Sequence, residues 1–225
     1  MDRYILLSSK DWHNKLLEKL KKRFFDSEWI LIQNEQSFTK EEIGKIKPKK
    51  IFIPHWSNKI SEEIYSNYEC VLFHMTDLPY GRGGSPLQNL ILRGHKKTKI
   101  TAIKVVRGLD EGPVYLKNDL DLLGTAKDIF LKSSEVIFNM ICEILEKKST
   151  PKPQEGQPVV FKRRKPDESK ISKLNELDEI YDYIRMLDCE GYPNAYIELN
   201  GIKYEFKKVK KKYNNLEANV RIKYT

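Results

Sequence analysis

The sequence predicts an α/β protein with a mostly parallel β-sheet flanked by helices, followed by a small C-terminal α+β part that contains a β-hairpin. Short apolar runs alternate with amphipathic helical patterns through the first 75 residues, which is typical of a doubly wound, Rossmann-like sheet. A long helical pattern fills residues 125–148, and a proline-rich stretch follows it at 149–158. We therefore expect a first domain at 1–150 and, after a linker, a second at 151–225.

The order of the elements follows from the hydrophobic pattern. Apolar runs predict parallel strands at residues 3–9, 28–33, 49–56 and 70–75, and apolar residues at helical spacing predict helices at 10–25, 37–47 and 57–68. Thr39 is the expected N-cap of the second helix, because its hydroxyl can accept a hydrogen bond from an N–H group of the first turn. Pro48 cannot continue that helix and marks its end.

The rest of the chain alternates less regularly. The pattern predicts a helix at 85–94, a strand at 97–106, an extended segment at 115–122, a helix at 173–187, a hairpin at 194–210 and a last strand at 218–224. Asn200-Gly201 forms the expected hairpin turn, since this dipeptide readily adopts the left-handed backbone that a two-residue loop requires. The basic segment 161–170 is expected to lie in solvent.

Composition limits the classes of protein to which the chain can belong. Its 225 residues carry 41 Lys and Arg against 32 Asp and Glu, and the formal charge of +9 suits an anionic partner. The three cysteines, Cys70, Cys142 and Cys189, are too sparse for a disulfide framework or a zinc site, which indicates a reducing compartment. The first residues lack the pattern of a signal peptide, and no apolar run approaches ~18 residues, so we expect a cytoplasmic protein without membrane partner or metal.

Two polar residues stand at the ends of predicted strands, where α/β sheets bind their ligands. His74 ends an apolar run and leads into a loop rich in glycine and proline, and Asp110 lies in a turn after the strand at 97–106. A carboxylate beside an imidazole fixes its tautomer and raises its basicity, so the pair can move a proton near neutral pH. The alternatives are a structural histidine and, because Gly108 and Gly112 flank it, an aspartate that only forms the turn.

Two motifs resemble those of the folate-dependent formyltransferases. FHMTDLPYGRGGSP at 73–86 is similar to that family's histidine loop, and ITAIKVVRGLDEGPVY at 100–115 is similar to its second motif, in which a strand leads to an aspartate turn. The 36-residue spacing from His74 to Asp110 agrees with the family, which makes the match more specific than either loop alone. GYPNAYIELNGIKYEF at 191–206 also resembles the family's C-terminal part.

The resemblance implies direct formyl transfer from N10-formyltetrahydrofolate to an amine, with no covalent enzyme intermediate and no metal. His74 would act as general base or oxyanion stabiliser, and Asp110 would orient it and help to remove the amine proton. The resemblance further implies a folate site at Pro54, His55, Trp56, Thr76, Asp77, Leu78, Pro79, Gly108, Leu109 and Gly112, and acceptor contacts at Tyr80, Arg82 and Gly83. Trp56 is equally explained as a core residue, and Arg82 as a solvated charge of the loop.

Leu72 departs from the family, which has an asparagine two residues before the histidine to help hold the developing oxyanion. Leucine has no hydrogen-bond donor, and the loss of such a donor typically costs ~100-fold or more in rate. A protonated His74, a backbone N–H group of the glycine loop or a water molecule could take its place. His55, Ser57 and Asn58, which end the neighbouring strand, could also reach the site.

The resemblance defines the acceptor less closely. The short chain and the HMTDLP loop are most similar to sugar-nucleotide N-formyltransferases, so we expect a UDP- or dTDP-linked 4-amino-4,6-dideoxy sugar, as in pathways of the pseudaminic acid type, and no nucleic-acid partner. A methionyl-tRNA formyltransferase fits less well, because that family carries a larger C-terminal barrel. The alternatives are an aminoacyl group on a tRNA or a carrier protein, a non-enzymatic interaction domain, and a nucleic-acid-binding domain, which the net charge and the basic segment FKRRK at 161–165 support. Homodimer formation stays open.

Overall fold

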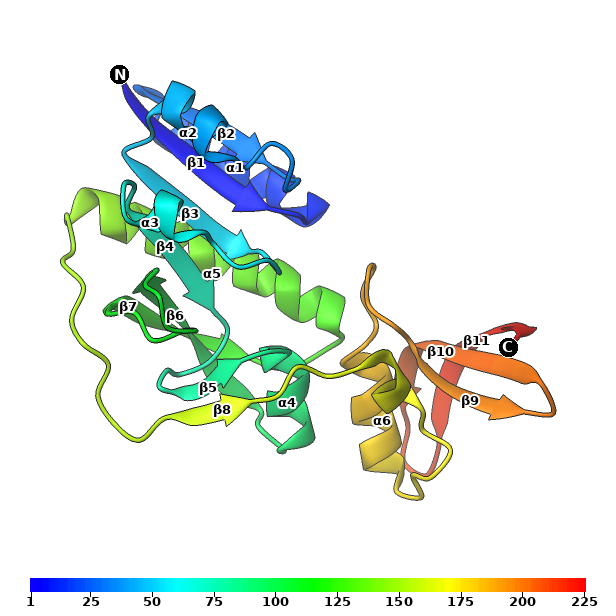
Figure 1. Cartoon of the computed structure of the whole chain (residues 1–225). Helices are drawn as coiled ribbons and strands as arrows, with labels where there is room; N and C mark the ends of the chain where they lie inside the picture. Colours follow the sequence, from blue (N-terminus) through cyan, green and yellow to red (C-terminus); the bar gives the residue numbers. More distant parts are fainter. The chain divides into compact units, whose positions relative to one another are not determined.

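The computed structural model describes residues 1–225, and the chain divides into two compact units (Figure 1). The first unit consists of Met1–Arg82, Lys99–Leu120 and Leu131–Val160, and the second of Gly83–Thr98, Asp121–Phe130 and Phe161–Thr225. Both units are discontinuous in sequence, and the division at residue 150 stays a prediction about domains. None of the helices combines the length and the apolar composition that a membrane crossing requires.

A six-stranded sheet in the order β2-β1-β3-β4-β6-β7 forms the centre of the first unit (Figure 1). Its strands are β1 (Asp2–Ser8), β2 (Ser27–Ile32), β3 (Lys50–His55), β4 (Cys70–His74), β6 (Lys97–Lys104) and β7 (Val114–Asp121). β1 pairs in parallel with β2 and β3, β3 pairs in parallel with β4, and β6 runs antiparallel to β4. The predicted α/β class with a mostly parallel sheet is confirmed.

Helices follow the first three strands in the predicted order. They are the 3₁₀ helix η1 (Asp11–His13) with α1 (Asn14–Arg23), then α2 (Lys40–Ile46) and α3 (Glu62–Tyr65). Thr39 caps α2, because its hydroxyl accepts a hydrogen bond from the backbone N–H of Glu42 at 3.3 Å. α3 is much shorter than predicted, since Ser61, directly before it, has the extended backbone that a helix interior cannot contain.

The apolar core of the first unit holds the strands in register. Buried side chains from the strands, from α2 and α3 and from the segment just before α3 form one cluster, which comprises Ile5, Leu7, Ile32, Ile43, Ile51, Ile53, Ile60, Ile64 and Cys70. Burying an aliphatic side chain of this size typically stabilises a fold by about 1.5–3 kcal/mol. A one-residue slip of any strand would turn its buried side chains toward the other face, so the cluster determines which residues stand at the strand ends.

The long helix α5 (Ala126–Glu146) follows β7, as the apolar stripe of the sequence predicts. Ion pairs from Lys19 to Glu135 and from Arg23 to Glu146 join its later turns to α1. Both pairs are largely exposed, so they contribute little to stability beyond the packing of the two helices.

The second unit contains α4 (Pro86–Leu92), the 3₁₀ helix η2 (Pro166–Ser169), α6 (Leu177–Arg185) and an antiparallel sheet in the order β11-β10-β9. The strands are β9 (Ala195–Leu199), β10 (Ile202–Lys211) and β11 (Leu216–Tyr224). Asn200 and Gly201 have φ angles of 51° and 75°, so the predicted hairpin turn is confirmed. The buried Arg185 donates hydrogen bonds to the backbone oxygens of Leu122 and Gly124, at 2.6 and 2.9 Å, and so ties α6 to the segment before α5.

Two short strands lie where the sequence predicted irregular or solvated chain. β5 (Tyr80–Gly83) falls in the glycine-rich loop after His74, and β8 (Val159–Phe161) follows the proline-rich stretch; the two strands pair. Phe161 and Ser169 are buried, so the expected exposure of the segment 161–170 is wrong at these two residues. Neither strand alternates polar and apolar residues, because each takes its extended backbone from the partner strand and not from a local pattern.

Candidate active site

His74 stands at the end of β4 with its side chain buried. Its Nε2 atom lies 2.8 Å from the backbone oxygen of Gly81. A carbonyl oxygen can only accept, so Nε2 donates this hydrogen bond and carries a proton. The other ring nitrogen, Nδ1, lies 3.6 Å from Oδ2 of Asp110, whose side chain is also buried. The structure therefore brings together the two residues that the sequence singled out.

Asp110 lies in the turn between β6 and β7, with a φ angle of 54°. This left-handed conformation costs most residues about 1–2 kcal/mol, and aspartate and asparagine tolerate it best. Gly112 in the same turn passes so close to the chain that a Cβ atom there would lie 1.6 Å from the backbone oxygen of Lys104. At Gly108, an added Cβ atom would meet the side chain of Glu111. The two glycines thus have a packing role, and their predicted folate contact stays a prediction.

Gly112→Ala should destabilise the turn that carries Asp110, because the new Cβ atom can be accommodated only if the backbone moves. Overpacking of this kind typically costs about 1–3 kcal/mol. A thermal melt should show a lower Tm, with a loss of activity at temperatures where the variant is still folded. Gly108→Ala is the matched control, since the carboxylate end of Glu111 can swing away; equal effects of the two variants would contradict this account.

The loop after His74 is held by Thr101 of β6, a completely buried residue. Its hydroxyl donates to the backbone oxygen of Thr76 at 2.6 Å and accepts from the backbone N–H of Leu78 at 3.3 Å. The hydroxyl of Thr76 in turn lies 3.4 Å from the backbone oxygen of Gly81, the atom that His74 also contacts. Sequence reasoning missed Thr101, although a polar residue inside the apolar run of a strand was a usable signal.

Lys117 of β7 holds the same loop from another side. Its ammonium group donates to Oδ1 of Asp77 at 2.6 Å and to the backbone oxygen of Leu78. The peptide bond between Leu78 and Pro79 is cis. Asp77 is thus bound within the protein, while its expected contact with folate stays a prediction. No pattern in the sequence distinguished Lys117 from the other lysines of the chain.

Arg82, a predicted acceptor-binding residue, is hydrogen-bonded to two side chains of the protein. Its Nε and Nη2 atoms lie 3.2 and 2.9 Å from Oε1 of Gln154, and Nη1 lies 3.1 Å from Oε1 of Glu111. Its side chain is only 17% exposed, so the reading of a freely solvated loop charge is wrong. Two further acceptor residues were predicted. Tyr80 is half-buried in β5. Gly83 lies close to β8, since a Cβ atom on it would be 2.4 Å from the backbone oxygen of Phe161.

The predicted residues of β3 lie at the same end of the sheet. β3 and β4 are in register at Ile53 and Leu72, and His55 and His74 come two residues later in their strands. Burial lowers the pKa of His55 to about 4, with the nearby positive charge of Lys10 as a second cause, so its imidazole is neutral at neutral pH. Trp56, just beyond the strand, packs against the apolar core of the first unit, which favours its reading as a core residue.

A third histidine, His13, adjoins this end of the sheet. Nδ1 of His13 lies 2.6 Å from the hydroxyl of Ser8, the last residue of β1, and both side chains are fully buried. Burial lowers the pKa of His13 to about 3, with His55 as a further cause, so this imidazole is also neutral at neutral pH. A neutral, buried imidazole that contacts the last residue of β1 fits a structural role for His13 at the end of this strand.

Two apolar residues complete the description. Leu109 is 69% exposed at the tip of the turn, next to Asp110. Leu72 is half-buried and packs against the apolar core, so its side chain offers no hydrogen bond to the site.

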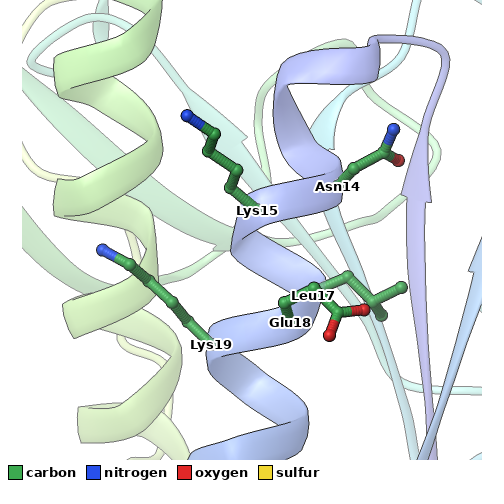
Figure 2. Close-up of a pocket in the computed structure, with 5 residues that line it drawn as sticks. All are labelled: Asn14, Lys15, Leu17, Glu18 and Lys19. Atoms are coloured by element: carbon green, nitrogen blue, oxygen red, sulfur yellow. The ribbon is translucent and has the colours of Figure 1, made fainter.

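A pocket of 450 Å³ lies elsewhere, on α1, and is lined by Asn14, Lys15, Leu17, Glu18 and Lys19 (Figure 2). It contains none of the predicted site residues.

A buried histidine–carboxylate pair at the carboxyl edge of a largely parallel sheet defines an α/β protein equipped for proton transfer. Residues 166–223 match the family model described as Methionyl-tRNA formyltransferase, C-terminal domain. The chain is 48% identical to the solved methionyl-tRNA formyltransferase from Clostridium thermocellum, with a TM-score of 0.97 and all of both chains covered. The chain belongs to the methionyl-tRNA formyltransferase family.

Other relatives match less of their own length. The methionyl-tRNA formyltransferase of Thermodesulfovibrio yellowstonii is 31% identical over 63% of this chain and 44% of its own, so the chain spans about half of such curated relatives. HypX from Aquifex aeolicus, solved in complex with tetrahydrofolic acid, shares the fold with a TM-score of 0.81, at 18% identity over 92% of this chain and 37% of that one.

The expected acceptor, a nucleotide-linked amino sugar of the pseudaminic acid type, is wrong. A sugar N-formyltransferase from Shewanella sp FDAARGOS_354 covers 97% of its own length and 92% of this chain with a TM-score of 0.70, but the 13% identity shows the fold alone. The 48% identity instead joins the chain to a methionyl-tRNA formyltransferase. The expectation failed because it treated the C-terminal part as too small for that family, whereas residues 166–223 match the family's C-terminal domain.

Proposed function

We propose that the protein transfers the formyl group of N10-formyltetrahydrofolate to the amino group of methionyl-tRNA. The observation that carries this proposal is the 48% identity, over the whole of both chains, to a solved methionyl-tRNA formyltransferase. The proposal replaces the sugar acceptor and also the expectation that no nucleic acid takes part. The formal charge of +9 is consistent with an anionic partner as large as a tRNA.

The chemistry requires one bond to form and one to break. The nitrogen of the amine attacks the formyl carbon, and the bond between that carbon and N10 of the folate breaks. The amine loses one proton, and N10 takes up one as tetrahydrofolate leaves. Nε2 of His74 already donates to Gly81, so Nδ1 is the nitrogen that can accept a proton, and it faces Asp110 at 3.6 Å. The carboxylate would stabilise the imidazolium that forms, since opposite charges attract strongly where water is excluded.

The residues near the pair fit a reduced folate. The exposed Leu109 offers an apolar surface to a flat ring, and the loop at 76–79, which Thr101 and Lys117 hold in place, can present backbone groups to its polar edge. Backbone recognition would also explain why Thr76 and Asp77 can differ from the family's residues, because main-chain groups do not depend on the side chain.

The direct test is formylation of methionyl-tRNA, followed by mass spectrometry of the released aminoacyl group. We expect formylmethionine from methionyl-tRNA, and no product from N-acetylated methionyl-tRNA, whose amine is blocked. A stable folate analogue should protect the amides of residues 74–84 from hydrogen exchange and raise the Tm by mass action. Folded protein that gives no formylmethionine with the natural donor would refute the proposal, whatever its affinity for the analogue.

Leu72→Asn should raise the rate of this transfer, because it supplies the amide donor that the resembling family has two residues before its histidine. A restored oxyanion donor typically contributes ~100-fold in kcat. The amide at this half-buried position should also lower the free energy of unfolding, by about 1–3 kcal/mol, if part of it lacks a partner. Leu72→Ala is the control, since it loses packing without adding a donor. An unchanged or lower kcat for Leu72→Asn would show that another group already serves the oxyanion.

A further inference from the structure

The proline-rich stretch before β8 is anchored to the first unit along its length. We call residues 151–158 the strap. Lys152 and Val114 of β7 exchange two backbone hydrogen bonds, of 2.6 and 2.8 Å. Just after the strap, the backbone N–H of Val159 donates to the oxygen of Pro79 at 3.1 Å. The strap therefore runs from the end of the sheet that carries the Asp110 turn to the loop that follows His74.

Gln154 is the residue of the strap whose side chain enters this region. Its Nε2 atom donates to the backbone oxygens of Asp110 and Gly112, at 2.7 and 2.9 Å. Its Oε1 atom accepts both hydrogen bonds from Arg82. A side-chain amide has two N–H donors, and here both go to the turn while the oxygen goes to the arginine. Both the nitrogen and the oxygen of the Gln154 amide therefore have hydrogen-bond partners within the protein.

Through these contacts, Gln154 is bound to the two segments that flank the imidazole of His74. The turn that it grips holds Asp110, which faces Nδ1 of His74. The arginine that it grips directly follows Gly81, whose backbone oxygen accepts from Nε2 of His74. Asp110 also has the left-handed backbone, a conformation that persists only where the surroundings hold it. The hydrogen bonds to the carbonyls at 110 and 112 clamp the chain on either side of Glu111, directly after this strained residue.

We infer that Gln154 is a positioning residue for formyl transfer, which holds the carboxylate of Asp110 at its working distance from His74. This inference rests on the proposed function of the same site. Gln154 itself would touch neither substrate, and its effect would pass through the turn. A displacement of about 1 Å in a catalytic constellation can cost ~100-fold in rate, so a single clamp of this kind has a measurable consequence.

Gln154→Met tests the inference, because methionine has a similar length and makes no comparable hydrogen bonds. Gln157→Met is the matched control, since Gln157 lies exposed in the same strap. We expect kcat to fall ~100-fold in Gln154→Met, with KM for both substrates within about twofold of wild type, and no change in Gln157→Met. Gln154→Glu should be impaired as well, because a carboxylate can still accept from Arg82 but cannot donate to the turn.

A double-mutant cycle separates positioning from general stability. If Gln154 acts through Asp110, Gln154→Met should cost little more once Asp110→Asn is present, since the charge that it positions is gone. The same ~100-fold loss in the Asp110→Asn background would overturn the inference, as would full activity of Gln154→Met or of Gln154→Glu. Each variant must first melt as a folded protein, so that the comparison concerns the site.

Hydrogen exchange keeps the inference testable even if the proposed function fails. Without any substrate, Gln154→Met should speed exchange of the amides at 107–113, while Gln157→Met should not. Unchanged exchange would mean that there is no clamp. Faster exchange in a protein that does not formylate methionyl-tRNA would leave the clamp in place and refute the proposed function alone.

Discussion

His74→Ala should lower kcat for formyl transfer by roughly a hundredfold to ten-thousandfold, the range that general acid–base groups typically contribute. The residue ends β4, is buried, and has one ring nitrogen on Gly81 and the other facing Asp110. Removal of the ring takes away the only group at this position that can accept and release a proton. The measurement is kcat with methionyl-tRNA and formyltetrahydrofolate.

The alanine variant also removes a buried hydrogen bond, so a second variant is needed to separate chemistry from folding. His74→Gln can still donate to the oxygen of Gly81 but cannot take up a proton. We expect it to melt close to wild type and to be nearly as inactive as His74→Ala. His95→Ala, in the loop after α4, is the control histidine and should keep its activity. Turnover of His74→Gln within a few-fold of wild type would remove His74 from the mechanism.

Asp110→Asn should lower kcat by roughly a hundredfold or more, because the amide cannot stabilise a positive charge on His74 as a carboxylate does. Asparagine tolerates the left-handed backbone of this position, whose φ angle is 54°, so the turn should keep its shape. The backbone oxygen that Gln154 contacts is unchanged by the substitution. The loss should therefore appear in kcat, with little change in Tm.

The same substitution decides between the two readings of Asp110. A residue that only forms the turn would be replaced by asparagine without loss, since both side chains suit this conformation. Asp110→Ala completes the comparison: it should lower both kcat and Tm, because alanine tolerates a positive φ poorly. Full activity of Asp110→Asn together with a low Tm for Asp110→Ala would leave Asp110 a structural residue.

The acceptor shows the limit of reasoning from short motifs. The histidine loop and the aspartate turn indicated the formyltransferase class, because their residue types and spacing reflect the reaction centre. The two motifs by themselves did not identify the acceptor. The whole-chain comparison with the Clostridium thermocellum protein corrected the expected acceptor. The match at residues 166–223 corrected the expectation that the C-terminal part is too small for that family.

The sequence by itself determined the features that depend on neighbours along the chain. The alternation of strands and helices, the cap at Thr39 and the turn at Asn200-Gly201 are local, because periodicity and turn chemistry act over a few residues. The meeting of His74 and Asp110 was predicted as well, but from a parallel pairing that the structure does not have. β6 runs antiparallel to β4, so its last residue lies opposite Val71 and not opposite His74. The loop between β6 and β7 brings Asp110 to His74.

Only the tertiary structure decided how those two residues are held. Thr101, Lys117 and Gln154 come from an antiparallel strand, a neighbouring strand and the strap, and each acts on loop backbone that lies 23 to 44 residues away in the chain. The pairing of β5 with β8 has the same character. Each of these hydrogen bonds has at least one backbone group as a partner, and every residue possesses such groups, so the identity of that partner leaves no local pattern. The contact exists only once the sheet has brought the segments together.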